Sequence, residues 1–460
     1  MALFASQPFS PTRASSGFNF LSKIKSHKES KLGVQRPQQQ RSSSDGSAPT
    51  QPSRCSHISI PAQQGAGLKT RRLSASPQDD FVVDTCELDD EFASASKIGR
   101  RKEIGQGASA TVKIMQRKGQ KKSDRDCLLA VKEFRKRSIR EDEEDYVRKV
   151  KSEYTIAKSL NHPNIVRTVR LCTHAGRWNH VMEYCQQREL FSLVERKYLK
   201  SEDKYCILKQ VLRAVDYLHD HGIAHRDIKL ENLLMTDEGY IKVTDFGVSE
   251  VFCGDHPGLP SSQGQCGKGM EENRKSVPGI CGSRPYISPE VLAKDKEYDS
   301  TKLDVWSCGI LFLTLYHNGN PWQSASKSEV NYALFAEGWD ALLSRSADTA
   351  IDENAYPQCG PLFSTLPIQS QRRCVLKMLH PDPNKRCTIK EALNDRWVKK
   401  IDCCSPDAVA SISTIDVSKV GCHMIAARMN IQAKHDHLPP PIKRMPQHRF
   451  DMGDGTSRYG

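Results

Sequence analysis

The sequence predicts an α+β fold, in which a small group of strands precedes a larger, mainly helical part. Residues 103–112 have the pattern of a strand, a tight turn and a second strand. Residues 129–132 and 181–185 are short apolar runs of the kind found in buried strands. Residues 304–309 open an apolar helix in the second half of the chain. Strands early and helices late therefore indicate two structurally different parts.

The turn within residues 103–112 has a composition that suits phosphate binding. Gly105 and Gly107 carry no side chain, so backbone N–H groups can approach an anion closely. A glycine turn without any ligand explains the same residues equally well. This segment alone therefore does not decide the function.

Two motifs farther along the chain are more specific. Residues 225–232 read His-Arg-Asp-Ile-Lys-Leu-Glu-Asn, and residues 245–247 read Asp-Phe-Gly. They supply a base, a cation and two oxygen ligands for Mg²⁺ at the spacing that phosphoryl transfer from Mg-ATP requires: Asp227, Lys229, Asn232 and Asp245. Together with the glycine turn and a strand that ends in Lys132, they make the sequence resemble the protein kinases over about residues 98–400.

The resemblance implies a role for each polar position. Asp227 would accept the proton of the incoming hydroxyl, and Lys229 would neutralise the moving phosphoryl group. Lys132 would hold the α- and β-phosphates of ATP and pair with Glu153 on the following helix. The Lys229 position, two residues after Asp227, favours Ser or Thr acceptors over Tyr.

The resemblance also implies where ATP binds. Backbone groups of Glu183 and Cys185 would bond the adenine, with Met182 behind it. Val112 would cover the adenine from above, and Leu234 would lie beneath it. The implied nucleotide-binding residues are Gly105, Gly107, Val112, Ala130, Lys132, Met182, Glu183, Cys185, Leu234 and Asp245.

The implied domain has the bilobal kinase fold. A five-stranded antiparallel sheet with one helix would form the small lobe from residues 98–183. Residues 184–188 would be the hinge, and residues 189–400 would form the mainly helical large lobe. ATP would bind between the two lobes.

Three further positions match scaffold residues of the family. Glu290, in a Ser-Pro-Glu sequence, and Arg386 would form a buried ion pair. Asp304 would brace the catalytic loop. They extend the resemblance to the end of the expected domain.

Two alternative functions are weighed against a protein kinase. A pseudokinase would keep the fold as a binding module but would be expected to lose Lys132, Asp227 or Asp245, and all three are present. A small-molecule kinase would not need the substrate-docking loop that precedes Glu290, because such a loop serves extended peptides.

Charge and composition separate the domain from its tails. Residues 1–78 contain 11 Lys or Arg and 2 acids, so this tail holds +9 of the net charge of +13. The basic balance therefore does not indicate a nucleic-acid partner for the domain. Residues 1–97 are rich in Ser, Pro and Gln, and we expect them to be disordered. The tail could touch anionic membrane surfaces, or its acid-free first 28 residues could be a mitochondrial transit peptide.

The sixteen cysteines are scattered, and no secretory or membrane-spanning segment is visible. We therefore expect a reducing, cytoplasmic location. Cys253, His256 and Cys266 could suggest zinc, but their irregular spacing favours free thiols.

The residues after the domain resemble one kinase subfamily. Residues 392–404 and 435–440 are similar to the fungal halotolerance and nitrogen-permease-reactivator kinases, in which a long Ser-rich tail precedes the domain. The resemblance implies control of plasma-membrane potassium and nutrient transporters. Residues 401–460 are expected to be a polar extension.

The activation segment departs from the family pattern. It has 46 residues from Asp245 to Glu290, and residues 252–279 are rich in Gly, Ser and Lys, so we expect a mobile, projecting loop. Gly279 occupies the position at which many kinases carry an activating phosphate, and Ser276 is the nearest hydroxyl. Dependence on phosphorylation is therefore in question.

Two acids suggest a peptide preference. In base-directed kinases, acids at the positions of Glu189 and Glu231 face the residues that precede the acceptor. They would favour Arg-x-x-Ser peptides through charge-assisted bonds, which would make Ser74 an autophosphorylation site. The alternative is that both are ordinary surface acids.

Overall fold

A computed structural model describes residues 81–95, 103–106, 110–119, 128–345, 351, 355–404 and 435–440. All of these residues belong to one structural unit of the chain. The predictions for residues 1–80, including Ser74, lie outside the described residues.

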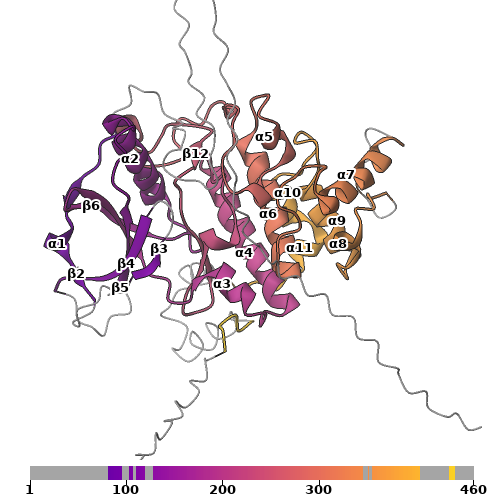
Figure 1. Cartoon of the computed structure of the whole chain (residues 1–460), viewed down its shortest axis with the longest axis horizontal. Helices are drawn as coiled ribbons and strands as arrows, with labels where there is room; N and C mark the ends of the chain where they lie inside the picture. The colour runs from indigo at the N-terminus through magenta and orange to yellow at the C-terminus, as the bar shows by residue number, and fades with distance from the viewer. Residues whose placement is uncertain are drawn as a thin grey trace, which may run out of the picture. The chain divides into compact units, whose positions relative to one another are not determined.

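A curled, largely antiparallel sheet and one long helix form the N-terminal lobe (Figure 1). Its seven strands have the order β1-β6-β7-β5-β4-β2, with β3 paired to β4. The elements of this lobe are β1 (Thr85–Glu87), α1 (Leu88–Glu91), β2 (Phe92–Ser94), β3 (Glu103–Gln106), β4 (Ala110–Arg117), β5 (Leu128–Phe134), α2 (Glu143–Ser159), β6 (Thr168–His174) and β7 (Arg177–Glu183).

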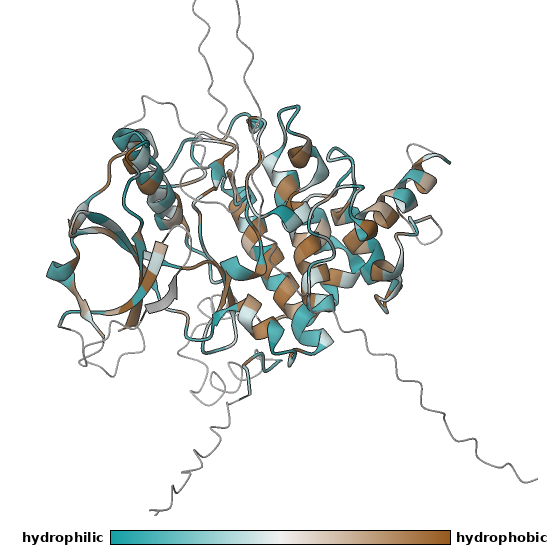
Figure 2. Ribbon diagram, viewed as in Figure 1, coloured by the Kyte–Doolittle hydropathy of each residue, from teal (hydrophilic) through white to brown (hydrophobic). Residues whose placement is uncertain are grey.

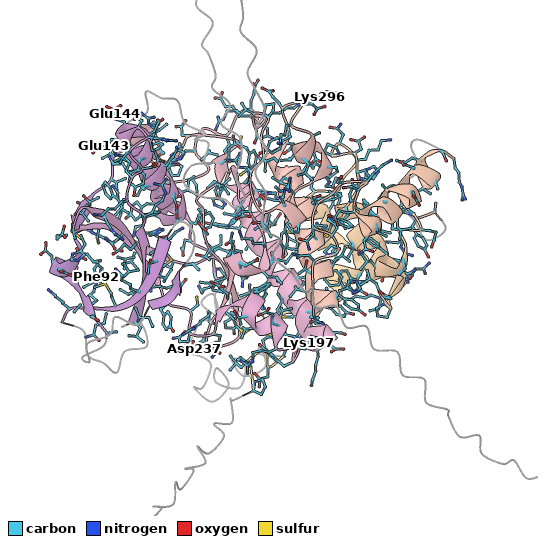
Figure 3. All side chains as sticks on the ribbon, in the orientation of Figure 1. Phe92, Glu143, Glu144, Lys197, Asp237 and Lys296 are labelled. Atoms are coloured by element: carbon cyan, nitrogen blue, oxygen red, sulfur yellow. The ribbon has the colours of Figure 1, made fainter. Side chains whose placement is uncertain are left out.

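The expected five-stranded sheet needs correction, because the sheet has seven strands. Residues 85–94 add β1, parallel to β6, and β2, antiparallel to β4. Phe92 is fully buried in a cluster with Leu88, Met115 and Val131, and Figure 3 labels it in this lobe. Strands of three residues are too short to show a period of two, so the sequence pattern gave no signal for them.

The C-terminal lobe is built around two buried helices. Helix α6 (Ser300–His317) is apolar on most of its circumference, as a helix buried on all sides must be. It packs against α4 (Ser201–Asp220), whose apolar face is also inaccessible to solvent. Figure 2 shows both as the brown centre of this lobe. The apolar helix that the sequence predicts from Asp304 is therefore present.

Shorter elements surround this helical core. The helices are α3 (Leu190–Glu195), α5 (Pro289–Ala293), α7 (Val330–Leu343), α8 (Pro361–Ser364), α9 (Gln369–Met378), α10 (Ile389–Asn394) and α11 (Arg396–Lys399). The strands are β8 (Arg188–Glu189), β9 (Ile223–Ala224), β10 (Leu233–Met235), β11 (Ile241–Val243) and β12 (Glu250–Val251). Strands β10 and β11 form a hairpin that carries the Asn232 and Asp245 regions at its open end.

The expectation that residues 252–279 project from the domain is wrong for residues 252–258, whereas most of residues 259–275 are exposed. Residues 252–258 are largely buried and pack against α2, where His256 Nε2 lies 3.0 Å from Ser152 Oγ. The His256 ring also stacks on Phe81, with ring centroids 4.4 Å apart. Farther along, Cys266 Sγ donates to the Ser159 carbonyl. Composition predicted a loop correctly but could not show that these few side chains attach it to a helix.

Candidate active site

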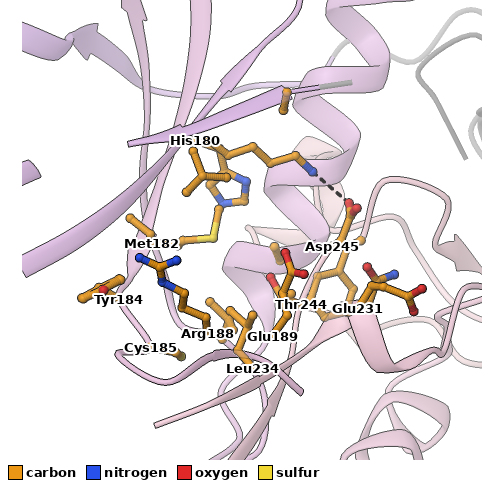
Figure 4. A pocket seen from close by; sticks show the side chains of 18 of the residues that line it. His180, Met182, Tyr184, Cys185, Arg188, Glu189, Glu231, Leu234, Thr244 and Asp245 are labelled. Atoms are coloured by element: carbon orange, nitrogen blue, oxygen red, sulfur yellow. Dashed lines mark hydrogen bonds and ion pairs between the residues drawn. The ribbon is translucent and has the colours of Figure 1, made fainter. Parts of the chain in front are cut away.

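Strand β5 and helix α2 bring a lysine and a glutamate together inside the N-terminal lobe. Lys132 Nζ lies 2.7 Å from Glu153 Oε1 and 2.8 Å from Asp245 Oδ1. Glu153 is almost completely buried, whereas the Asp245 side chain is 36% exposed. Lys132 therefore joins α2 of one lobe to the Asp-Phe-Gly sequence of the other. Figure 4 marks the ion pair at Asp245 with a dashed line.

The loop after β9 holds the predicted base. Lys229 Nζ donates to Asp227 Oδ2 at 2.8 Å, and Asn232 Nδ2 donates to the same oxygen at 3.2 Å and to the Asp227 carbonyl at 2.9 Å. The other carboxylate oxygen, Oδ1, is buried and has no hydrogen-bond partner within the described part of the chain. A buried acceptor without a donor is costly, so its presence indicates a site for a donor that arrives with a ligand.

The environment of Lys229 keeps it charged. Burial disfavours its ammonium form, but the Asp227 carboxylate, by charge and hydrogen bond, together with Glu231 and Asp245, raises the pKa of Lys229 overall. The ammonium also donates to Ser283 Oγ at 2.7 Å, which links the catalytic loop to the segment before α5. A fixed positive charge thus lies beside the unsatisfied oxygen of Asp227.

Asp304 at the start of α6 braces this loop, as the sequence predicts. Its two carboxylate oxygens accept from the backbone N–H groups of His225 at 2.8 Å and of Arg226 at 2.7 Å. Arg226 has a φ of 65°, a strained value for a residue with a side chain. The two charge-assisted bonds compensate that strain and hold Asp227 in place. Nearer the end of the domain, Arg386 forms the expected ion pair with Glu290, through two hydrogen bonds of 2.7 and 3.0 Å.

A cavity of about 630 Å³ lies between the two lobes, beside these groups. Its volume is in the range of small-molecule sites. The predicted residues that line it are Val112, Ala130, Lys132, Glu153, Met182, Cys185, Lys229, Asn232, Leu234 and Asp245. The mixture of an apolar end and a charged end suits a ligand with an aromatic base and an anionic chain.

Among the predicted site residues that the structure describes, Asp227, Gly105 and Glu183 do not line this cavity. Asp227 lies beside it through Lys229, and Gly105 lies in β3, opposite Val112. Gly107 lies outside the described residues. The carboxylate of Glu183 accepts from the Arg167 backbone and pairs with Lys242 at 2.9 Å. For Glu183, the prediction concerned only the backbone.

Sequence reasoning missed several lining residues. His180 and Met182 both line the cavity, because alternate residues of β7 share one face. Applying that period of two backwards from Met182 would have found His180. Thr244 also lines the cavity and is adjacent to the Asp-Phe-Gly sequence. Arg188 lines it as well and has an unusual backbone φ of 66°, a conformation that no pattern in the sequence signals.

Comparison with known proteins identifies this architecture. Residues 98–398 match the family model described as the protein kinase domain. The chain belongs to the protein kinase family. The bilobal fold that the resemblance implied is thus confirmed, apart from the two additional strands.

The most similar relatives include fungal serine/threonine kinases. Serine/threonine-protein kinase HAL4/SAT4 of Saccharomyces cerevisiae is 35% identical over 68% of this chain and 48% of its own length. The hal4 kinase of Schizosaccharomyces pombe is 34% identical over 67% and 44%, and the nitrogen permease reactivator protein of S. cerevisiae is 34% identical over 66% and 39%. The resemblance to this kinase group is confirmed. The chain spans about half of the length of these relatives, or less.

Among the described residues, no helix is both long enough and apolar enough to cross a bilayer.

Proposed function

We propose that the protein is an ATP-dependent serine/threonine protein kinase. The observation that carries this proposal is the unsatisfied Oδ1 of Asp227, placed beside Lys229 and next to the interlobe cavity. The family match and the serine/threonine kinases among its relatives support it.

The residues around the cavity fit Mg-ATP. The apolar side chains of Val112, Ala130 and Leu234 form one packed cluster with Met182 and Cys185, a suitable surround for adenine. Lys132 is the cation for the phosphates, and Glu153 fixes its position. Asn232 commits its Nδ2 to Asp227, which leaves the amide oxygen as a ligand, and Asp245 presents a partly exposed carboxylate. Mg²⁺ bound by these two oxygens would neutralise phosphate charge.

Asp227 then acts as the proton acceptor. Its Oδ1 takes the proton from a Ser or Thr hydroxyl as the new phosphate ester bond forms and the bond from the γ-phosphoryl group to the β-phosphate oxygen breaks, which releases ADP. Lys229 stabilises negative charge on the transferred phosphoryl group, and its bond to Ser283 positions it for this task. Most of the catalytic effect therefore comes from positioning and electrostatics.

The substrate is proposed to be a basic protein segment. Glu189 and Glu231 both line the cavity and can be seen there in Figure 4. Burial, then the nearby Glu231 carboxylate, raises the pKa of Glu189, as expected for two acids that face one site. An arginine preceding the acceptor would relieve this repulsion.

We also propose that the physiological substrates are plasma-membrane ion or nutrient transporters. The support is the relative named nitrogen permease reactivator protein. A cytoplasmic location, and peripheral contact of the basic N-terminal tail with anionic membrane, would bring the enzyme to such substrates.

Labelled ATP separates the proposal from its alternatives. The full chain is incubated with γ-labelled Mg-ATP and a Ser/Thr peptide library, with Lys132→Met as the inactive control. We expect label in peptides that depends on Lys132. Nucleotide binding without transfer would indicate a pseudokinase, and label only in small metabolites of a cell extract would indicate a small-molecule kinase.

A further inference from the structure

Three side chains far apart in the sequence form a second cluster, away from the active site. Cys206, Cys404 and His437 are all buried, and one ligand atom of each lies within 4.8 Å of the others. Cys206 is on α4, Cys404 follows α11, and His437 belongs to the segment 435–440. None of them lines the interlobe cavity. They are the only group of this kind among the described residues.

The tautomer of His437 leaves one ring nitrogen in need of a partner. Its Nδ1 is 2.8 Å from the Gly239 carbonyl, which can only accept, so Nδ1 carries the proton. The lone pair is then on Nε2, which is buried and has no hydrogen-bond partner in the described part of the chain. The nearest carboxylate oxygen, on Asp203, is 4.0 Å away. This is how a metal-binding histidine is usually oriented by its surroundings.

The sulfur of Cys206 is also tied directly to the Cys404 segment. The backbone N–H of Cys404 donates to Cys206 Sγ at 3.1 Å, which holds the two cysteines side by side. The described cysteines form no disulfide, so both thiols are available as ligands. A third thiol is adjacent, because Cys403 Sγ lies 3.9 Å from the Cys206 carbonyl and 3.4 Å from the Cys404 carbonyl.

We propose that Cys206, Cys404 and His437 bind a structural Zn²⁺ ion. Cys403 Sγ lies outside this group and contacts two backbone carbonyls, so it would become the fourth ligand only after a change of rotamer. Thiolate and imidazole ligands in a closed site are the combination that zinc prefers. With Zn–S of about 2.3 Å and Zn–N of about 2.0–2.1 Å, tetrahedral S–S and S–N pairs lie roughly 3.5–3.8 Å apart. The three ligand atoms, now within 4.8 Å of one another, would therefore approach by up to about 1 Å. Each thiol loses its proton to solvent when the metal binds.

The ion would fasten the C-terminal extension to the kinase domain. Tyr198 Oη donates to the His437 carbonyl at 3.0 Å, and an Arg196 guanidinium N–H donates to the Pro440 carbonyl at 3.0 Å. In Figure 1 the yellow segment accordingly lies beside α3 and the start of α4. Because Gly239 is in the turn of the β10–β11 hairpin, the site would also brace the hairpin that bears Leu234.

Metal analysis tests this site without relying on activity. The full chain is purified with zinc and without chelator, and its metal content is measured by mass spectrometry. We expect about one zinc ion per chain, reduced several-fold by Cys206→Ser, Cys404→Ser, Cys403→Ser and His437→Gln. Cys266→Ser and Cys387→Ser replace half-buried thiols outside the cluster and should leave the zinc content unchanged.

A second measurement uses the unmodified chain, in case the variants fail to fold. Removal of zinc by a strong chelator should lower Tm, zinc should restore it, and magnesium should not. Cobalt in place of zinc should give the intense visible absorption of tetrahedral thiolate coordination. Three results would overturn the proposal. The first is a purified chain that contains no metal and whose Tm does not change when chelator is added. The others are a Cys206–Cys404 disulfide in the purified protein, and full zinc content in the Cys206, Cys404 and His437 variants.

Discussion

The Arg226 guanidinium lies 2.6 Å from Glu250 Oε2, so the arginine of the His-Arg-Asp motif already has an anionic partner. Arg226 is buried, and its Nε also donates to the Val248 carbonyl at 2.7 Å. Ser276, itself buried, donates to the same Glu250 oxygen. Glu250 therefore provides, within the protein, the negative charge that a phosphate on the activation segment would provide.

Activity should consequently not require phosphorylation of the activation segment. Enzyme made in bacteria and treated with phosphatase should retain most of its peptide activity, as should Ser276→Ala. Glu250→Gln should lose about tenfold or more, because an unpaired buried charge costs roughly 3–5 kcal/mol. Loss of activity after phosphatase treatment that Ser276→Ala reproduces would show instead that Ser276 is the switch.

The Glu189–Glu231 pair should select arginine before the acceptor. Each contact should be worth about 1–3 kcal/mol, or roughly 5- to 150-fold in kcat/KM. Because the pKa of Glu189 is raised, the preference should weaken as pH falls and the carboxylate protonates. We would test this with a positional-scanning peptide library. The enzymes compared are wild type, Glu189→Ala, Glu231→Ala, the double variant with both substitutions, and the surface control Glu195→Ala. Arginine enrichment that survives the double substitution would refute it.

His256 should make the fold sensitive to acid. The Gly258 N–H donates to its Nδ1, so the ring is neutral, and burial followed by the charge of Arg274 lowers its pKa from 6.5 to about 4. Between these pH values the unfolded chain binds a proton that the folded protein does not. Stability therefore falls, by roughly 2–4 kcal/mol in total, as pH drops from 6.5 to 4. His256→Gln should show a smaller fall of Tm over this range; parallel curves would contradict the assignment.

The sequence alone predicted which site residues lie together where their roles depend on short spacings along the chain. Asp227, Lys229 and Asn232 lie within six residues, so their chemistry could be read directly and the structure brings them together. Lys132 and Glu153 could be paired because the family places them on a strand and the next helix. In each case the motif itself contains the geometric information.

Spacing could not reveal contacts between distant segments. The attachment of residues 252–258 to α2 depends on His256, Ser152 and Phe81, which no motif connects. The cluster of Cys206, Cys404 and His437 joins positions up to 231 residues apart and exists only once the C-terminal extension folds back. Short strands such as β1 and β2 owe their existence to pairing with β6 and β4, because three residues have little intrinsic preference.

The most direct test of the kinase assignment is the Asp227→Asn variant, compared with wild type for both peptide phosphorylation and nucleotide affinity. The substitution keeps the shape of the side chain but removes the proton acceptor next to Lys229. We expect kcat to fall by roughly 10²–10⁴ while the Kd for a fluorescent ATP analogue changes little. Asp245→Asn, which removes a proposed Mg²⁺ ligand, should instead weaken Mg-dependent nucleotide binding. Wild-type turnover by Asp227→Asn would contradict the account.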